Sequence, residues 1–475
     1  MQLNSRRSLF TLLLGTFLIL AMNAGTETGS NDPVRKGTGP SLMDLPERDL
    51  PGMGQSGMDQ TGMDQTGMHE TEKAPANHYD LLDMNQLAIG MWVTPPDQFR
   101  NDREFKRIAH AGINFVNGFG YYENSPDKIK TTLDLCAKHN LKYFVNQGDI
   151  HTAILSYAEK PSPAMLDTFI AGVKEYVNHQ AYAGELLFDE PGKPLFGSVA
   201  AFTKQYEKYY PDKMWHVNLF PSYATEGIRS ASYEEYISFW LDQLDPGYLS
   251  FDSYPLLAGG GIIQDYFYNL DLVRTKTVER KIPFWTFIQT LSIAQTPGVP
   301  DKRDPTEEEI RWQVWVNLAF GAKGIQYFCY WSPGSGSEVF SDALITRDGK
   351  KTNKYNYVKR INSDIHKPGE VLLHCDAVGV IQTTASPYPL YRESLHSFGP
   401  IKGVRGDDNL TGCFLGPDGR HHVLVTPLTP NSGATVKFTL EDTVDYATVI
   451  KGKNKKQIKI KDGELIQSIS PGDAL

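Results

Sequence analysis

The run GELLFDEPG, residues 184–192, is the stretch of this sequence that decides the fold. Its apolar residues are typical of a buried strand, two acids follow directly, and the Pro-Gly pair then ends the strand. It is the fourth in a series of eight expected strands. In a barrel of alternating strands and helices, the carboxyl ends of the strands form the face that carries chemistry. Asp189 and Glu190 are therefore predicted to take part in proton transfer.

Apolar runs alternate with helical segments through the middle of the chain, which predicts a parallel sheet. The expected strands are 87–93, 113–119, 141–146, 184–188, 214–219, 248–252, 283–289 and 324–330. The expected helices are 102–111, 127–139, 165–179, 195–210, 233–244, 264–280, 306–322 and 354–366. Eight such units match a (β/α)8 TIM barrel. A doubly wound open sheet is the alternative, but no Gly-rich phosphate loop follows the first strand.

The composition changes along the chain and divides it into four expected segments. They are a signal peptide (1–25), a disordered linker with Gly-Met-Asp-Gln-Thr repeats (26–80), the barrel (81–370) and a small all-β sandwich domain (371–475). An arginine pair before a short apolar run indicates export, to the periplasm or outside the cell, by the general secretory route rather than the twin-arginine route. The apolar run is short for a membrane span, so the mature chain is expected to have none.

The charge and the aromatic content limit the class of partner. The 475 residues carry a formal net charge of −9, which gives no basic surface for nucleic acid. The chain contains 24 Tyr, 23 Phe and 7 Trp. Aromatic faces stack on sugar rings, although they also fill protein cores. A carbohydrate is therefore the expected partner.

Amides and aromatic rings are concentrated at the predicted strand ends, where they could bind sugar hydroxyls and ring faces. The predicted substrate-binding residues are Trp92, Tyr121, Asn146, Asn218, Tyr254, Gln289 and Trp331. Only His216 among the histidines falls in a predicted strand, and a lone histidine is seldom a metal ligand. We therefore expect neither a metal nor another cofactor, and a metal-dependent hydrolase is disfavoured.

The order of elements resembles that of glycoside hydrolases with a (β/α)8 barrel followed by a β-sandwich. Three patterns carry the resemblance: FDEPG at 188–192, FDSYP at 251–255 and LAFGAKGIQYF at 318–328. The resemblance implies cleavage of a poly- or oligosaccharide, with Glu190 as the general acid/base. It also implies that Trp331 forms the floor of a sugar subsite. It does not select one family within this superfamily.

One departure leaves the mechanism open, because common retaining families carry a Glu nucleophile where this sequence has Gln289. In one interpretation, Asp189 orients the 2-acetamido group of a substrate that supplies its own nucleophile. In a second, Asp252 or Asp149 is the base of an inverting reaction. In a third, the barrel is degenerate and the exported protein binds glycan without cleaving it.

The acids of the sequence are expected to differ in role. An adjacent Asp189 and aromatic neighbours should raise the pKa of Glu190, which suits a proton donor. Glu185 lies at the other end of the same strand, where it is expected to serve stability. Asp149 and Glu338 lie in predicted loops, where an acid is usually just solvated.

Overall fold

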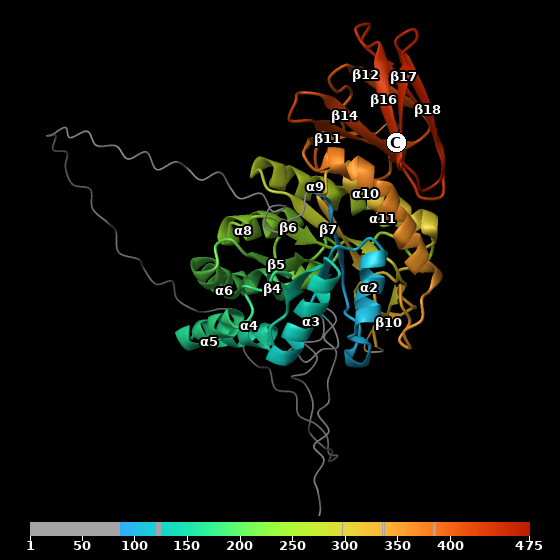
Figure 1. Ribbon diagram of the computed structural model, residues 1–475. Coiled ribbons are helices and arrows are strands. Elements are labelled where there is room, and N and C mark those ends of the chain that lie inside the picture. The colour runs from blue at the N-terminus through green and yellow to red at the C-terminus, as the bar shows by residue number, and fades with distance from the viewer. Residues whose placement is uncertain (1–85, 120–124, 297, 335, 337, 383–385) are drawn as a thin grey trace, which may run out of the picture. The chain divides into compact units, whose positions relative to one another are not determined.

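A computed structural model describes residues 86–119, 125–296, 298–334, 336, 338–382 and 386–475. The expected signal peptide, the linker and Tyr121 lie outside these residues. Eight parallel strands close a barrel, because the last strand pairs with both the seventh and the first (Figure 1). The strands are β1 (Ala88–Met91), β2 (Phe115–Asn117), β3 (Lys142–Val145), β4 (Tyr182–Asp189), β5 (Met214–Leu219), β6 (Leu249–Phe251), β7 (Phe284–Gln289) and β9 (Gly324–Phe328). The predicted (β/α)8 barrel is confirmed.

Helices follow the strands and surround the barrel (Figure 1). They are α2 (Asp102–His110), α3 (Pro126–Lys138), α4 (Ile150–Glu159), α5 (Pro163–Lys174), α6 (Phe196–Tyr209), α7 (Thr225–Ile228), α8 (Tyr233–Leu244), α9 (Tyr266–Glu279), α10 (Glu307–Ala319) and α11 (Asn353–Leu372). Helix α4 was not expected, because no side chain caps its start and it is short. No helix in the described part of the chain is long and apolar enough to cross a membrane.

Two loops at the mouth of the barrel are joined by a short ribbon. Strand β8 (Ile293–Ala294) follows β7, and β10 (Val339–Phe340) follows β9. The two strands pair antiparallel, with Val339 opposite Ala294. The loops after the seventh and eighth barrel strands are therefore held together.

The C-terminal region forms antiparallel sheets, as predicted for this part of the chain. One sheet contains β11 (Asp376–Gln382), β13 (Asn409–Leu415) and β14 (His421–Pro427). A second contains β12 (Ile401–Gly406), β15 (Ala434–Leu440) and β18 (Glu464–Ile469), and a hairpin is formed by β16 (Tyr446–Lys451) and β17 (Asn454–Lys459).

Helix α10 joins the barrel to the first of these sheets. The indole Nε1 of Trp312 donates a hydrogen bond to the carbonyl of Pro427 over 3.0 Å. Phe414 and Leu424 from the sheet belong to the same apolar core as the barrel residues. The backbone of Gly412 lies so close to Ala319 that a Cβ there would overlap its carbonyl oxygen. A close, apolar contact of this kind favours a structural role for the sheet.

A glycine in β4 offers a test of the close approach between β4 and β5. A Cβ at Gly184 would overlap the backbone carbonyl of Met214, which cannot move as a side chain can. We expect Gly184→Ala to destabilise the protein by about 1–3 kcal/mol, as overpacking does. Urea unfolding followed by fluorescence measures this change.

The matched control is Gly197→Ala in helix α6, where the nearest atom to an added Cβ is the Gln243 amide at 3.7 Å. This variant should keep or raise the unfolding midpoint, because alanine suits a helix better than glycine. Equal midpoints for Gly184→Ala and the wild type would contradict the predicted clash.

Candidate active site

A bulge in β4 decides which way its acids point. The pairing of β4 with β5 shifts register between Leu186 and Phe188, so Leu187 is an extra residue. Before the bulge, Glu185 faces the helices, where the hydroxyls of Tyr176 and Tyr182 donate hydrogen bonds to it over 2.9 and 2.8 Å. If side chains alternated regularly along the strand, Asp189, four residues later, would also face the helices. The bulge reverses this, so that Asp189 points into the barrel.

Three acids meet at the carboxyl ends of β4 and β6. Asp189 hydrogen-bonds Asn218 of β5, and Asn218 also hydrogen-bonds Asp252, the residue after β6. The side chains of Glu190 and Asp252 are hydrogen-bonded to each other. The structure therefore brings together all three predicted catalytic residues, with Asn218 beneath them as a shared partner.

The backbone at Glu190 is strained. Its φ is +52°, in the left-handed region that residues other than glycine seldom adopt. Its N–H donates to the carbonyl of Asn218 over 2.8 Å, and the next carbonyl, of Pro191, accepts from the Tyr236 hydroxyl over 2.8 Å. These bonds hold the turn in place. Strain of this kind is often found at functional sites, because the surrounding structure must maintain it.

The surroundings of Glu190 favour its protonated form. Burial has the largest effect on the pKa of Glu190, and the negative charges of Asp252, Asp189 and Glu338 raise it further. Burial likewise raises the pKa of Asp189 and of Asp252. Asp189 and Glu190 nevertheless keep part of their surface exposed. The site therefore contains a carboxyl group whose protonated form is favoured and which keeps surface for a ligand.

A small cavity of about 180 Å³ adjoins this group of acids. Its lining includes Asp189, Asn146, Phe119 and His151. The His151 ring stacks on Phe188 at 3.9 Å, and burial lowers the pKa of His151 to about 4. A neutral imidazole is thus available to a ligand there. His151 is the second residue of the unexpected helix α4, which is why the sequence did not indicate it.

Two predicted sugar-stacking residues are buried in the barrel wall. Trp92 is 2% exposed and stacks on Phe119, with ring centroids 4.7 Å apart. Trp331 is 1% exposed, and its ring lies 4.7 Å from that of Phe99. Neither presents a free ring face to a ligand in this arrangement.

The predicted amide ligands also differ in exposure. Gln289 is fully buried, and its side chain accepts from the N–H of Leu256 and donates to the carbonyls of Leu291 and Arg303. Asn146 and Tyr254 keep exposed surface, although Asn146 donates to the carbonyl of Leu186 over 3.0 Å. Tyr254 hydrogen-bonds Asp252. Of the predicted binding residues described here, Asn146 and Tyr254 are the ones positioned to contact a ligand.

Two further side chains near Tyr254 were not among the predicted site residues. The Tyr223 hydroxyl accepts from the N–H of Tyr254 over 3.1 Å. The Lys302 ammonium lies 4.6 Å from the centre of the Tyr223 ring and is buried, and burial lowers the pKa of Lys302 to about 8. Lys302 belongs to an irregular loop, so no periodic pattern could have indicated it.

Within the described residues, no three His, Cys, Asp or Glu side chains are grouped in a way that could hold a metal ion. His216, the one histidine expected in a strand, is buried and contacts the Tyr248 hydroxyl through Nδ1 at 2.6 Å. Burial lowers the pKa of His216 to about 3. It is a core residue beneath the site.

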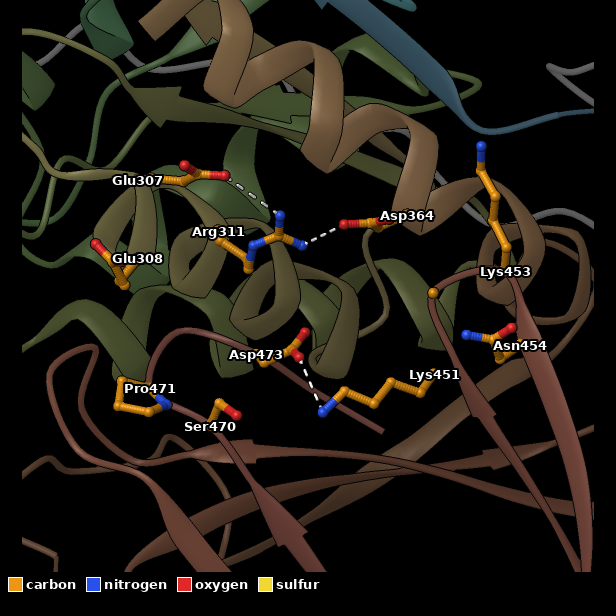
Figure 2. Close-up of a pocket in the computed structure, with 11 residues that line it drawn as sticks. Glu307, Glu308, Arg311, Asp364, Lys451, Lys453, Asn454, Ser470, Pro471 and Asp473 are labelled. Carbon is orange, nitrogen blue, oxygen red and sulfur yellow. Dashed lines mark hydrogen bonds and ion pairs between the residues drawn. The ribbon is translucent and has the colours of Figure 1, made fainter. Parts of the chain in front are cut away.

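A larger cavity, of about 690 Å³, lies between α10, α11 and the C-terminal sheets (Figure 2). Five of its charged residues are paired with each other: Arg311 contacts Glu307 and Asp364, and Lys451 contacts Asp473 (Figure 2). None of the predicted site residues lines it. Paired surface charges of this kind do not by themselves make a reactive site.

Residues 203–367 match the model of a family of glycoside hydrolases, family 42, described as beta-galactosidase. The second half of the barrel is similar to these enzymes. The match bears out the predicted resemblance to barrel glycoside hydrolases. It begins after Glu190, so it includes Asp252 but neither Asp189 nor Glu190. A search of the curated proteins found no match.

Several solved structures are similar to this chain at low identity. The beta-galactosidase from the psychrophilic Marinomonas ef1 is 12% identical, with a TM-score of 0.44 and 59% of each chain covered. The beta-galactosidase from Bacillus circulans sp. alkalophilus is 12% identical, with a TM-score of 0.46, over 62% of this chain and 58% of that one. The Thermobacillus composti GH10 xylanase is 12% identical, with a TM-score of 0.38, over 60% of this chain and all of that one. This chain thus covers less than two thirds of the two beta-galactosidases.

The raised pKa of Glu190 predicts how stability depends on pH. The folded protein holds a proton there that the unfolded chain loses above a pKa of about 4.3, so stability falls as pH rises from that value toward the folded pKa. We expect Glu190→Gln to raise the urea midpoint, and to raise it more at pH 8 than at pH 5.

The control is Glu159→Gln, which makes the same change at an exposed position of α4. Its effect on the midpoint should be small at both pH values. If Glu190→Gln gave the same gain at pH 5 and pH 8, the folded structure would not be favouring the protonated acid.

Proposed function

We propose that this protein hydrolyses glycosidic bonds, with Glu190 as the general acid. One observation carries the proposal: a partly exposed carboxyl group at the mouth of the barrel, whose pKa is raised by burial and by two adjacent acids. A carboxyl group with a raised pKa is suited to give its proton to the leaving oxygen of a sugar. The family match to residues 203–367 supports the same class of reaction.

We propose that Asp252 keeps Glu190 protonated rather than acting as the second catalytic carboxylate. The two carboxyl groups of an inverting enzyme are about 6.5–9.5 Å apart, and those of a retaining enzyme about 5–5.5 Å. Glu190 and Asp252 are in hydrogen-bond contact, which leaves no room between them for a sugar or a water. Asp189, beside the small cavity, suits the orientation of a substrate group such as a 2-acetamido substituent.

The substrate class follows from the same considerations. The cavity of about 180 Å³ beside Asp189 has the size of one sugar unit, and it offers polar groups for hydroxyls. The description of the matching family makes β-galactosides the first substrates to test. N-acetylated hexosides are the second, because they could supply their own nucleophile.

We expect Glu190→Gln to lower the rate of hydrolysis about 10²–10⁴-fold, the usual contribution of a positioned acid. The assay uses aryl and unactivated glycosides of both substrate classes. The loss should be much smaller with a dinitrophenyl leaving group, because this group needs little protonation.

Glu159→Gln serves as the matched control and should keep the wild-type rate. Wild-type rates for Glu190→Gln on unactivated glycosides would remove Glu190 from the reaction. Equal losses on both kinds of leaving group would point to a role other than proton donation.

Asp252→Asn should change the pH dependence of the reaction. The charge of Asp252 and its hydrogen bond both raise the pKa of Glu190. Without that charge, Glu190 should lose its proton at lower pH, so the alkaline limb of the kcat/KM profile moves to lower pH. Asp212→Asn, at an exposed turn after α6, is the control and should leave the limb in place. An unmoved limb in Asp252→Asn would show that Asp252 does not act on the acid.

A further inference from the structure

The ribbon formed by β16 and β17 carries a block of positive charge. Residues 446–461 read YATVIKGKNKKQIKIK and contain no acid. The chain as a whole has a formal net charge of −9, so its overall balance conceals this local excess. A block of like charges often marks an interaction surface. The lysines of this block are Lys451, Lys453, Lys455, Lys456, Lys459 and Lys461.

The pairing of the two strands sorts their side chains onto two faces. Tyr446 lies opposite Lys459, and Ile450 lies opposite Lys455. Because side chains alternate along each strand and opposite residues share a face, one face, here named the tyrosine face, contains six residues. All of them except Ile450 are exposed. The six are Tyr446, Thr448, Ile450, Lys455, Gln457 and Lys459.

The other face of the ribbon is turned to the protein. Ala447 packs against the apolar core of the C-terminal sheets. Lys451 contacts Asp473 over 3.3 Å, so its charge is used within the chain. The tyrosine face is the one that remains for a partner.

Acids do not neutralise the lysines of the tyrosine face. In the part of the chain that the structure describes, the side chains of Lys455 and Lys459 form no ion pair. The same holds there for Lys453, Lys456 and Lys461. Neighbouring charges of one sign add up over the Debye length, which is about 8 Å at physiological salt. The ribbon therefore attracts anions.

A cavity of about 830 Å³ adjoins the tyrosine face. Tyr446, Thr448, Ile450 and Lys455 are among its lining residues. The lining also includes Arg420, and it contains no Asp or Glu. A ligand on this face therefore has room beside it and meets no opposing carboxylate side chain.

The spacing of the charges selects a polymer. Lys455 and Lys459 are four residues apart on one strand, so their Cα atoms are about 14 Å apart. One small anion cannot bridge that distance, whereas a chain with repeated acidic groups can. Tyr446, which is 52% exposed and lies opposite Lys459, offers a ring face of the kind that stacks on sugars.

Protection of a free sheet edge does not account for all of these features. Lysines on an edge strand prevent it from pairing with other chains, and this explains the charge of the ribbon. It does not explain an exposed tyrosine ring among the lysines, or the cavity beside them. A bound partner explains all three.

We propose that the tyrosine face binds an anionic polysaccharide, one whose sugars carry carboxylate or sulfate groups. Lys455 and Lys459 pair with these groups, and Tyr446 stacks on a sugar ring. The choice of a polysaccharide over another polyanion rests on the proposed hydrolase function. No residue of this face belongs to the candidate active site, so the face holds the polymer and does not cut it.

Calorimetric titration of the full-length chain tests the binding. The ligands are polygalacturonate, which carries carboxylates, dextran sulfate, which carries sulfates, and neutral dextran. We expect binding to at least one charged polymer and none to dextran. Lys455→Gln combined with Lys459→Gln should weaken that binding about 5- to 25-fold, because each exposed ion pair contributes up to about fivefold.

Lys204→Gln combined with Lys208→Gln is the matched control. These two lysines are also exposed and four residues apart, on helix α6, and the variant loses the same charge. It should bind as the wild type does, which separates the ribbon from a general effect of net charge. Tyr446→Ser should also weaken binding, whereas Tyr209→Ser, at a tyrosine that is 51% exposed, should not.

The wild type and the double variant at Lys455 and Lys459 must differ if the ribbon is the binding site. Equal affinities overturn the inference, and so does binding to neither charged polymer or equal binding to dextran. Tighter binding to duplex DNA or to phosphatidylglycerol vesicles overturns the choice of partner. The titration needs no hydrolysis, so a chain that binds but cleaves no glycoside keeps this inference and loses the proposed function. Equal urea midpoints show that the variants are folded.

Discussion

The extra residue in β4 is the constraint on which the site depends. Two acids, Glu185 and Asp189, stand four residues apart on one strand, and uniform pairing would turn both to the same side. The bulge at Leu187 separates them. One is buried among tyrosine hydroxyls against the helices, and the other meets Asn218 inside the barrel. The group of three acids exists because of this single irregularity.

The group formed by Asp189, Glu190 and Asp252 lowers the stability of the fold. Burying carboxyl groups beside one another is unfavourable once they ionise, and the left-handed backbone at Glu190 adds strain. The neighbouring structure offsets this with specific bonds, from Asn218 below and from Tyr236 to the turn that follows. A site that opposes stability in this way is expected where function rather than packing has selected the residues.

The barrel and its acids could be predicted because their signals are local. Apolar runs, turn residues and acids at strand ends are all visible within a few residues of sequence. The sequence could not give the burial of Trp92 and Trp331, because each is covered by a residue from another loop. It could not give the position of Glu338 either, since that depends on pairing between β8 and β10, which are far apart in the chain. Sequence reasoning could therefore identify Asp189 and Glu190, but it could not place residues whose positions depend on contacts between distant segments.

The bulge also makes the length of β4 a poor guide to where its acids point. Removing Leu187 would leave Glu185 and Asp189 three residues apart in regular pairing with β5, and they would still face opposite sides of the sheet. A strand of unchanged length but without the bulge would instead turn both acids to the same side. In aligning distant relatives, equal length in this strand is therefore no assurance that the aspartate faces the barrel, whereas the pairing with β5 decides it.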